Sequence, residues 1–442
     1  MAPVPDRVPS DAERPSRVDT VVVGGGIIGV STALELAERG VSVALLEKGE
    51  IAAEQSSRNW GWCRQMGRDP REIPLIVESL KSWRGMNARI GAETGYRQTG
   101  ILYLAETEAE LQKRAAWLDY AREYQLDSRL IRGEEVERMM PGATRSWKGA
   151  LYTPTDGRAE PTMAAPAMAR HLKSLGASVL TRCAVRGVER SAGRVSSVVT
   201  ERGRIGCDSV VLAGGAWSRL FCGPLGIDLP QLKVVNSVMR TAPIETGLER
   251  AGAGGRFAFR RRLDGGYTVA HRHLSVVDIV PDSFRLLLDF LPAYRLDPLG
   301  LRLRVGGRFI AEARLPRRWA LDRPSPFEAV RVLDPEPVEW VLKQAAESLK
   351  SYFPAFRGME VVEKWAGAID ATPDAVPVIS PVESVPGFYL ATGFSGHGFG
   401  LGPGAGRLAA DLVMGRTPVV DPAPFRFTRF SDGSRPRPIT GL

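Results

Sequence analysis

The feature that most constrains this fold is a short apolar strand that runs directly into a glycine-rich turn. Residues 19–23 read DTVVV, a β-branched run typical of a buried parallel strand. The turn that follows, GGGIIG over residues 24–29, fits the spacing G-x-G-x-x-G. An apolar helix then ends at Gly40, and a second strand over residues 41–46 ends at Glu47. This order of strand, glycines, helix, strand and acid predicts a dinucleotide-binding unit.

Each part of this unit has a physical role. Gly24 permits the tight turn, Gly26 lets the backbone approach a pyrophosphate, and Gly29 lets helix and strand pack closely. The helix N-terminus offers unpaired N–H groups and a partial positive charge to the phosphates. Glu47 is placed to accept from a ribose hydroxyl and would repel the 2′-phosphate of NADP, but the unit does not separate NAD from FAD. The residues assigned to the cofactor from this unit are Gly24, Gly26, Ile27, Ile28, Gly29, Glu47 and Lys48.

Two later segments also end strands in small residues. Residues 210–218 form a strand whose end could approach adenine or ribose, although a simple tight turn accounts for the same residues. A strand over residues 388–392 leads into a glycine-rich turn over 393–406 and a helix over 407–414, and the turn amides could face the pyrimidine edge of a flavin. His397 could adjust the charge beside the ring, or be purely structural. The residues assigned to the cofactor here are Ala213, Gly214, Gly215, Trp217, Gly393, Ser395, Gly396, His397, Gly398 and Phe399.

Together these segments resemble the D-amino acid oxidase (DAO) family of FAD-dependent amine oxidoreductases, in the branch with sarcosine oxidase, glycine oxidase and D-amino acid dehydrogenases. The resemblance covers residues 18–420 and rests on VVVGGGIIG with Glu47, AGGAW at 213–217 and GFSGHGF at 393–399. It implies an α/β fold with a discontinuous Rossmann-type (glutathione-reductase-like) FAD-binding domain and a second, mostly antiparallel-sheet substrate domain. It also implies that Ser56, Ser57 and the backbone of Val185 contact the cofactor.

The domain boundaries that follow from this resemblance interleave along the chain. We expect the FAD-binding domain to be built from residues 18–90, 146–230 and 360–420, and the substrate domain from residues 91–145 and 231–359. Residues 1–17 and 421–442 are polar and Pro-containing, and we expect them to be tails, the first of them disordered.

The chain departs from the family pattern at two positions. Some sarcosine oxidases hold the flavin through a cysteine before a T-P-D-like segment, whereas residues 368–372 contain none, so we expect noncovalent FAD. Those enzymes also place a lysine directly after G-H-G-F, where this chain has Gly400, so their mode of substrate anchoring or oxygen activation is not carried over.

The segment after Ser57 should leave the cofactor and enter the substrate pocket. A guanidinium can hold a carboxylate through two parallel hydrogen bonds, and Arg64 is the expected substrate anchor. The rival anchors are Arg68 and one face, Arg260 and Arg262, of a predicted hairpin over residues 257–270.

Other side chains near this region have simpler interpretations. Trp60 and Trp62 could wall the pocket, and Cys63 is interpreted as a packed thiol. His271 and His273 follow the hairpin at strand spacing without a partner cysteine or acid, so no metal site is expected.

The resemblance implies oxidation of the C–N bond of an amino acid or secondary amine, such as a D-amino, N-methyl or cyclic amino acid. Hydride transfer to flavin N5 would give an imine that water hydrolyses. A dehydrogenase that passes electrons to a quinone or carrier is slightly favoured over an oxidase that makes hydrogen peroxide, because the lysine after G-H-G-F is missing. An FAD subunit of an opine- or sarcosine-oxidising complex remains an alternative. Outside the class stand an RNA-modifying flavoprotein and a nicotinamide-only dehydrogenase.

Composition and charge limit the classes of partner that the protein is expected to bind. The net charge of +9 suits an anionic small substrate, and the arginines are scattered instead of forming a basic arm, which argues against a nucleic-acid partner. Four cysteines are too few for a disulfide scaffold, and no targeting segment or spanning helix is evident, so a cytoplasmic location is expected. Residues 284–301 are interpreted as a core helix broken at Pro292, with contact to the inner face of a membrane near its quinone pool as the alternative. The oligomeric state is left open.

Overall fold

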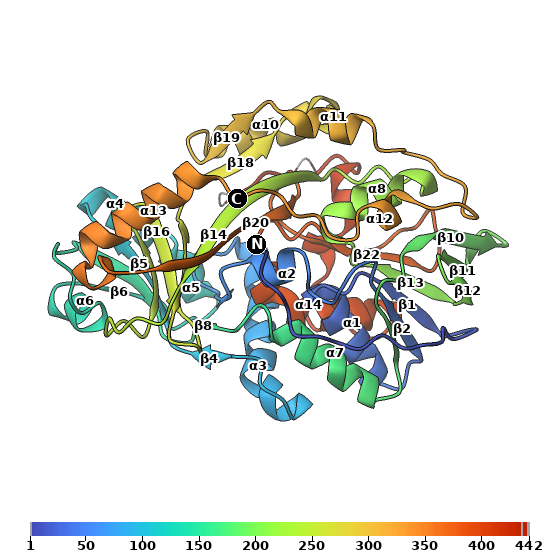
Figure 1. The fold of residues 1–442 in the computed structure, drawn as a ribbon, viewed down its shortest axis with the longest axis horizontal. Coiled ribbons are helices and arrows are strands. Elements are labelled where there is room, and N and C mark those ends of the chain that lie inside the picture. Colours follow the sequence, from blue (N-terminus) through green and yellow to red (C-terminus); the bar gives the residue numbers. More distant parts are fainter. Residues whose placement is uncertain (1, 435, 440–442) are drawn as a thin grey trace.

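The computed structural model describes residues 2–434 and 436–439, and its first layer is a six-stranded, mainly parallel sheet (Figure 1). The strand order is β21-β22-β13-β1-β2-β9, in which only the edge strand β21 runs antiparallel to its neighbour. The strands span Val378–Pro381 (β21), Phe388–Thr392 (β22), Ser209–Leu212 (β13), Thr20–Val23 (β1), Val43–Leu46 (β2) and Ser178–Leu180 (β9). The central position of β1 agrees with its uniformly apolar sequence, because strands covered on both faces need no polar side.

Four helices pack beside this sheet and share one apolar core. They are α1 (Ile27–Glu38), α3 (Ile73–Ile90), α7 (Ala164–Ser174) and α14 (Gly398–Val413). A separate three-stranded antiparallel sheet lies beyond β13 and contains β10 (Val185–Ser191), β11 (Arg194–Thr200) and β12 (Gly203–Gly206).

Helix α14 begins nine residues earlier than the helix expected over 407–414. The glycines assigned to a turn therefore lie inside the helix, where side-chain-free positions allow close packing against α1 and α3. A Cβ on Gly404 would lie 2.7 Å from the carbonyl oxygen of Leu75, and one on Gly406 would lie 2.5 Å from Ser31. Glycine costs helix propensity, and tight packing offsets that cost here.

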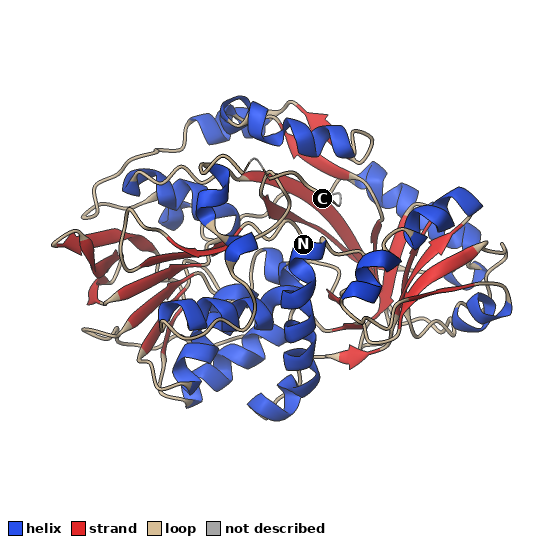
Figure 2. Cartoon of the chain, turned by 180° about the vertical axis from the view of Figure 1, so that it is seen from behind, coloured by secondary structure: helices blue, strands red, loops and turns tan. Residues whose placement is uncertain are grey.

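The second layer is a large mixed sheet with the strand order β19-β18-β14-β17-β16-β15-β5-β7-β6, to which β20 adds by pairing with β14. Figure 2 shows strands gathered toward both ends of the molecule, with helices packed between and around them. Helix α13 (Glu339–Tyr352) closes an aromatic core on this sheet. The strands span Leu301–Arg304 (β19), Ser275–Asp278 (β18), Leu232–Thr241 (β14), Tyr267–His271 (β17), Phe257–Arg261 (β16), Ala251–Gly254 (β15), Ile101–Ala105 (β5), Gly149–Thr153 (β7), Arg129–Ile131 (β6) and Val361–Ala371 (β20).

Two strands assigned to the FAD-binding domain belong to this large sheet instead. β7 pairs with β5 and β6, and β20 pairs with β14 over nearly its whole length. Sequence periodicity does not reveal which sheet a strand joins, because that depends on pairing between distant segments. The predicted hairpin is confirmed, since β16 and β17 pair antiparallel.

Both chain ends are more ordered than their composition predicts. The segment expected to be a disordered N-terminal tail lies along the parallel sheet, with Val8 buried and the amide of Asp11 bonded to the carbonyl of Val179 at 2.9 Å. At the C-terminal end, Phe425 and Arg429 are buried. These contacts with distant segments supply the burial that the tail sequences lack by themselves.

The remaining elements are short. The small sheet β3-β8-β4 is built from Trp62–Cys63 (β3), Gly157–Arg158 (β8) and Arg97–Gln98 (β4). The other helices are α2 (Gln55–Arg58), α4 (Glu108–Ala115), α5 (Leu118–Glu123), α6 (Glu134–Met139), α8 (Ser218–Cys222), α9 (Pro281–Arg285), α10 (Leu287–Leu296), α11 (Gly307–Ala313) and α12 (Pro326–Ala329).

The expectation of a core helix over residues 284–301 is wrong. Helices α9 and α10 lie on the outside, in the layer with β19 and α11 along the top of Figure 1. Leu288 is 82% exposed and Phe284 is 65% exposed. Helix α10 continues through Pro292, although the helix does not enter the core. Among the described helices, none is both long and apolar enough to cross a membrane.

Candidate cofactor and substrate site

A cavity opens at the carboxyl end of β1. This is where the crevice of an open parallel sheet is expected to bind a ligand. The predicted residues that line it are Gly24, Gly26, Ile27, Ile28, Glu47, Lys48, Ser56, Val185, Ala213, Gly214, Gly215, Trp217, Gly396, Gly398 and Phe399. Sequence reasoning missed further lining residues, among them Val23, Leu46, Glu54, Gln55, Asn59, Phe327, Ala368 and Asp370, which carry no motif of their own.

The start of α1 forms one end of the cavity. Gly24 adopts a positive φ of 112°, and a Cβ there would lie 2.4 Å from the carbonyl oxygen of Ala213. The N-cap residue, Gly26, has no side chain to cap the helix, and the Ile27 amide donates to Ser56 Oγ at 2.8 Å. Gly29 does not line the cavity, because a Cβ there would lie 1.9 Å from the Gly24 carbonyl oxygen. Its role is the close packing of helix on strand that the motif predicts.

Glu47 holds the turn beside the cavity. Its two carboxylate oxygens accept hydrogen bonds from the amides of Gly25 and Gly49, each at 2.7 Å. Burial raises the pKa of this carboxyl, while the ammonium of Lys48 acts in the opposite direction. Lys48 itself pairs with Glu54 at 2.5 Å and lies 4.5 Å from the centroid of the Trp217 ring, so it forms part of one wall.

The start of α14 forms the opposite end. Asp370 Oδ2 accepts from the amides of Gly393 at 2.7 Å and Phe394 at 3.3 Å, which fixes the turn before the helix. Gly393 and Ser395 therefore do not line the cavity as predicted. Ser395 Oγ instead accepts from the Thr372 amide at 3.2 Å and supports the turn from behind.

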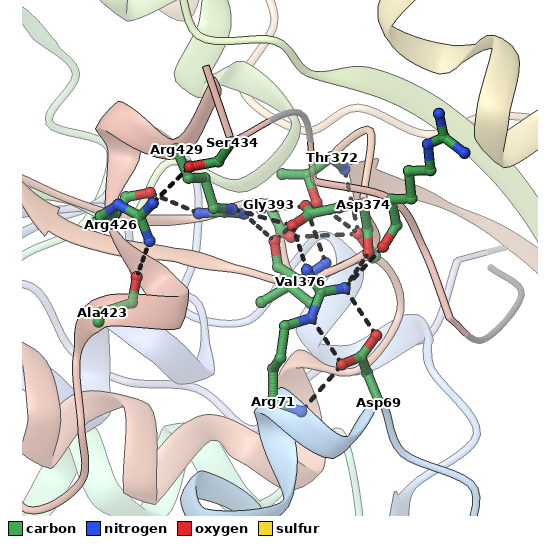
Figure 3. A network of polar contacts seen from close by, with 12 residues as sticks. Asp69, Arg71, Thr372, Asp374, Val376, Gly393, Ala423, Arg426, Arg429 and Ser434 are labelled. Atoms are coloured by element: carbon green, nitrogen blue, oxygen red, sulfur yellow. Dashed lines mark hydrogen bonds and ion pairs between the residues drawn. The ribbon is translucent and has the colours of Figure 1, made fainter. Parts of the chain in front are cut away.

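A buried ionic network braces the same turn (Figure 3). Asp374 is fully buried and pairs with Arg429 at 3.0 Å and Arg71 at 3.1 Å. Arg429 also donates to the Val376 carbonyl at 2.7 Å, and Arg71 pairs with Asp69 at 2.8 Å. The network links the C-terminal segment to the segments that precede α3 and α14.

Comparison with known proteins agrees with this geometry. Residues 19–412 match the family model described as DAO, FAD dependent oxidoreductase. The chain therefore belongs to the DAO family of FAD-dependent oxidoreductases. Its structure superposes on the L-amino acid deaminase from Proteus myxofaciens, solved in complex with anthranilate, with a TM-score of 0.93, 37% identity and 97% of each chain covered. The L-amino acid deaminase from Proteus vulgaris superposes with a TM-score of 0.92 and 35% identity, covering 96% of this chain and 100% of that one.

Curated relatives are more distant in sequence. Glycine oxidase of Pseudomonas aeruginosa is 28% identical over 92% of this chain and 97% of its own length. Sarcosine oxidase subunit beta of Rhizobium meliloti is 26% identical over 94% of this chain and 89% of its own length.

FAD is the cofactor of this family, and the cavity fits it. Two long helices, α1 and α14, direct their N-termini at the cavity, and in neither does the N-cap residue cap the helix with its own side chain. In α1 the Ile27 amide is bonded to Ser56, and the other first-turn amides remain to face a pyrophosphate or a flavin ring edge. Gly26 leaves the space that a backbone-to-phosphate approach needs. The lining residues run from the start of α1 to the start of α14, so one cavity joins the two helix ends.

Besides Gly29, Gly393 and Ser395, two further residues predicted to contact the cofactor lie away from the cavity. Ser57 is buried behind it, and its Oγ bonds to the Glu54 carbonyl at 3.3 Å. His397 turns its imidazole toward α3, where Nδ1 lies 2.9 Å from a carboxylate oxygen of the buried Glu72. Burial and the charge of Arg68 lower the pKa of His397, against the effect of Glu72. The side chain therefore does not lie against the cavity, and only its neighbours Gly396 and Gly398 do.

The predicted substrate segment lies next to this histidine. Arg64 is half-buried, donates to the Met66 carbonyl, and lies 5.6 Å from the centroid of the Tyr103 ring. Arg68 is only 2% exposed and bonds to the Arg64 carbonyl at 3.1 Å. Among the described residues, no carboxylate lies within ion-pairing distance of either guanidinium, so both are free to bind an anion.

The rival anchors on the hairpin are already occupied. Arg260 is buried and holds Glu160 through two contacts of 2.8 and 2.9 Å, while Arg262 pairs with Asp264 at 3.0 Å. Trp60 and Trp62 meet edge to face at 5.2 Å, and their role as a pocket wall stays a prediction. Within the described residues no cluster suited to a metal ion is present, and His271 Nδ1 accepts from backbone amides. Cys63 is buried, and burial raises the pKa of its thiol, which agrees with a packed role.

Proposed function

We propose that the protein uses FAD to oxidise the C–N bond of an amino acid or N-alkyl amino acid. The observation that carries the proposal is the position of Arg64 and Arg68. Neither guanidinium has a carboxylate partner among the described residues, and their segment packs on the start of α14, where a Cβ on Gly400 would lie 3.5 Å from the backbone nitrogen of Arg64. The same end of α14 lines the cofactor cavity through Gly398 and Phe399. The anthranilate bound to the Proteus myxofaciens deaminase is a carboxylate, which supports a carboxylate site in this fold. L-amino acids are the first substrates to test, because both Proteus structures are named as L-amino acid deaminases.

The roles of the residues follow from their contacts. When bound, the flavin accepts a hydride equivalent from the α-carbon, and the resulting imine is hydrolysed by water. Arg64 holds the substrate carboxylate and thereby orients the α-hydrogen. Trp60 and Trp62 exclude water from one side of the site, and His397 acts as a positioning residue that, through Glu72, ties the start of α14 to α3.

The cavity lining also favours noncovalent FAD. The described lining residues include no cysteine, histidine or tyrosine, the residue types able to form a bond to the flavin ring. Cys63, which directly precedes Arg64 in the substrate segment, is buried in the hydrophobic core.

The electron acceptor is the second part of the proposal. Leu287, Leu288, Leu299 and Val305 are all more than half exposed and lie in the outer layer formed by α10 and β19. An apolar surface of this kind suits contact with the inner face of a membrane, where a quinone would reoxidise the flavin. The competing acceptors are a carrier protein, a subunit partner and oxygen. Flotation with lipid vesicles tests this part, and Leu288→Glu should reduce the floated fraction.

Anaerobic reduction of the purified yellow protein tests the whole proposal. Each member of a panel of amino acids and N-methyl amino acids, in both enantiomers, is added without oxygen, and bleaching of the flavin bands is followed. At least one of them should bleach the flavin at a rate that saturates with concentration. Failure of every amine in the panel would reject the proposed substrate class.

A further inference from the structure

Two arginines from separate parts of the chain, Arg64 and Arg114, lie over the ring of Tyr103, and two more, Arg68 and Arg272, interact electrostatically with them. Arg64 and Arg68 come from the segment after β3, Arg114 from α4, and Arg272 from the end of β17, and we refer to them as the arginine cluster. The guanidinium carbons of Arg64 and Arg114 lie 5.6 Å and 5.5 Å from the centroid of the Tyr103 ring. The charge of Arg272 lowers the pKa of Arg114, so Arg272 is included in the cluster for its electrostatic effect.

These arginines differ from the other buried arginines of the protein. Arg58, Arg260 and Arg429 are at most 2% exposed, and each pairs with a carboxylate at 3.0 Å or closer. In the part of the chain that the structure describes, no carboxylate lies within 4 Å of any member of the arginine cluster. Some other interior guanidinium nitrogens also lack a hydrogen-bond partner among the described residues, as in Arg158, but Arg158 has a carboxylate, Glu160, at 3.5 Å. The absence of a carboxylate partner is what sets the cluster apart.

Several hydrogen-bond donors in this region are buried and have no partner among the described residues. They are Arg68 Nη1, Arg114 Nε and the indole nitrogen of Trp62, whose ring lies 6.2 Å from that of Tyr103. A buried donor without a hydrogen-bond partner costs free energy, and the cost is larger when the group is charged. A ligand with acceptor oxygens would relieve that cost.

The cluster retains its positive charge at neutral pH. Burial, together with the neighbouring Arg64, lowers the pKa of Arg68 to about 10, and burial with Arg272 lowers the pKa of Arg114 to about 10. Both values lie well above neutrality, so each guanidinium remains a cation that favours an anion beside it.

The nearby acids neutralise only part of this charge. Glu72 is held by His397, and the oxygens of Asp156 accept from the amides of Gln65 and Met66. Burial raises the pKa of Asp156 to about 7, so it is not a full negative charge at neutral pH. Glu106 is exposed to solvent, where its effect is screened. Glu110, which acts on Arg114 and Arg272, is half-buried and accepts from the Glu106 amide. One substrate carboxylate would therefore leave cations unmatched.

We propose that the arginine cluster binds two acidic groups of one substrate, so that the preferred substrate is an amino acid or N-alkyl amino acid with a second carboxylate. This inference rests on the proposed function and specifies its substrate class. Arg64 and Arg68, whose segment packs on the start of α14, bind the carboxylate next to the reacting carbon. Arg114 and Arg272, on the other elements of the cluster, bind the second one.

Binding of unreactive acids to the FAD-loaded enzyme tests this inference without any turnover. Succinate, glutarate and adipate are titrated against butyrate at one fixed ionic strength, and dissociation constants are read from the flavin spectrum and from calorimetry. At least one dicarboxylate should bind roughly 30-fold tighter than butyrate, because a desolvated charge pair contributes on that scale. Equal binding of butyrate and all three dicarboxylates would overturn the inference.

Variants of Arg114 and Arg272 test where the second carboxylate of the substrate binds. Arg114→Gln and Arg272→Gln should each weaken dicarboxylate binding by at least tenfold more than they weaken butyrate binding. Arg122→Gln is the matched control, because this arginine is exposed on the adjacent α5 and pairs with Asp119. If both cluster variants bind dicarboxylates as the control does, the inference fails.

The same panel separates this inference from the proposed function. Bleaching by monocarboxylic amino acids with no preference for acidic ones rejects the second carboxylate and leaves amine oxidation standing. Tight dicarboxylate binding without bleaching by any amine supports the cluster as a dicarboxylate site and rejects amine oxidation.

Discussion

Replacing Arg429 by methionine would break the buried ionic network that joins the C-terminal segment to the turn before α14. Arg429 is 2% exposed, and its guanidinium makes two contacts with Asp374, at 3.0 and 3.1 Å, and one with the Val376 carbonyl. Methionine fills a similar volume without donors. Asp374 would then keep only Arg71 as a charged partner.

The expected loss of stability depends on the contacts that Asp374 keeps in the variant. Removing one partner of a buried ion pair costs about 3–5 kcal/mol, and the retained contact of Arg71 places this case near the lower end. For a chain of 442 residues, an unfolding entropy of roughly 2.1 cal/mol/K per residue converts about 3 kcal/mol into a decrease in Tm of about 3 °C. The turn that Asp374 braces contacts the cofactor cavity, so flavin should also be lost more readily on dilution.

Thermal unfolding of the holoenzyme measures this effect, with the flavin-to-protein ratio after gel filtration as the second readout. Arg426→Met is the matched control, since Arg426 lies on the same segment but pairs with the partly exposed Asp432. Surface pairs contribute about 0–1 kcal/mol, so the control should change Tm by less than about 1 °C. If the two variants unfold at the same temperature, the buried network does not stabilise the fold as argued.

Three further predictions concern the cofactor and the substrate. Acid precipitation should release the yellow colour into the supernatant, and colour that stays with the pellet would contradict noncovalent FAD. Gly26→Val should yield largely apo protein with a lower Tm, because its side chain would occupy the approach to the pyrophosphate and remove stabilisation by bound cofactor; unchanged flavin content would refute this placement. Arg64→Met should lower kcat/KM by roughly 30- to 3,000-fold at normal FAD content, and near wild-type kcat/KM would show that Arg64 is not the anchor.

Local sequence was sufficient for the nucleotide-binding unit because its parts are close along the chain. Gly24, Gly29 and Glu47 lie within one βαβ unit, and the spacing of these residues already determines their geometry. Ser57 and His397 were predicted to contact the cofactor, but their side chains lie away from the cavity. The direction of a side chain depends on what packs against it, and the local sequence does not show this. His397 turns away from the cavity since Glu72, far away in sequence, lies on its other side.

Tertiary structure decided the features that depend on distant partners. The glycines before residue 407 suggest a turn locally, but close packing against α1 and α3 makes them helical. The polar C-terminal segment is ordered because Asp374 provides a buried charge for Arg429. The arginine cluster is invisible in a sequence with scattered arginines, since only the fold brings arginines from three segments together near Tyr103. The sequence by itself determined that this chain binds a dinucleotide, because the residues of that unit are close along the chain, while the charge of the proposed substrate site arose only when distant segments packed together.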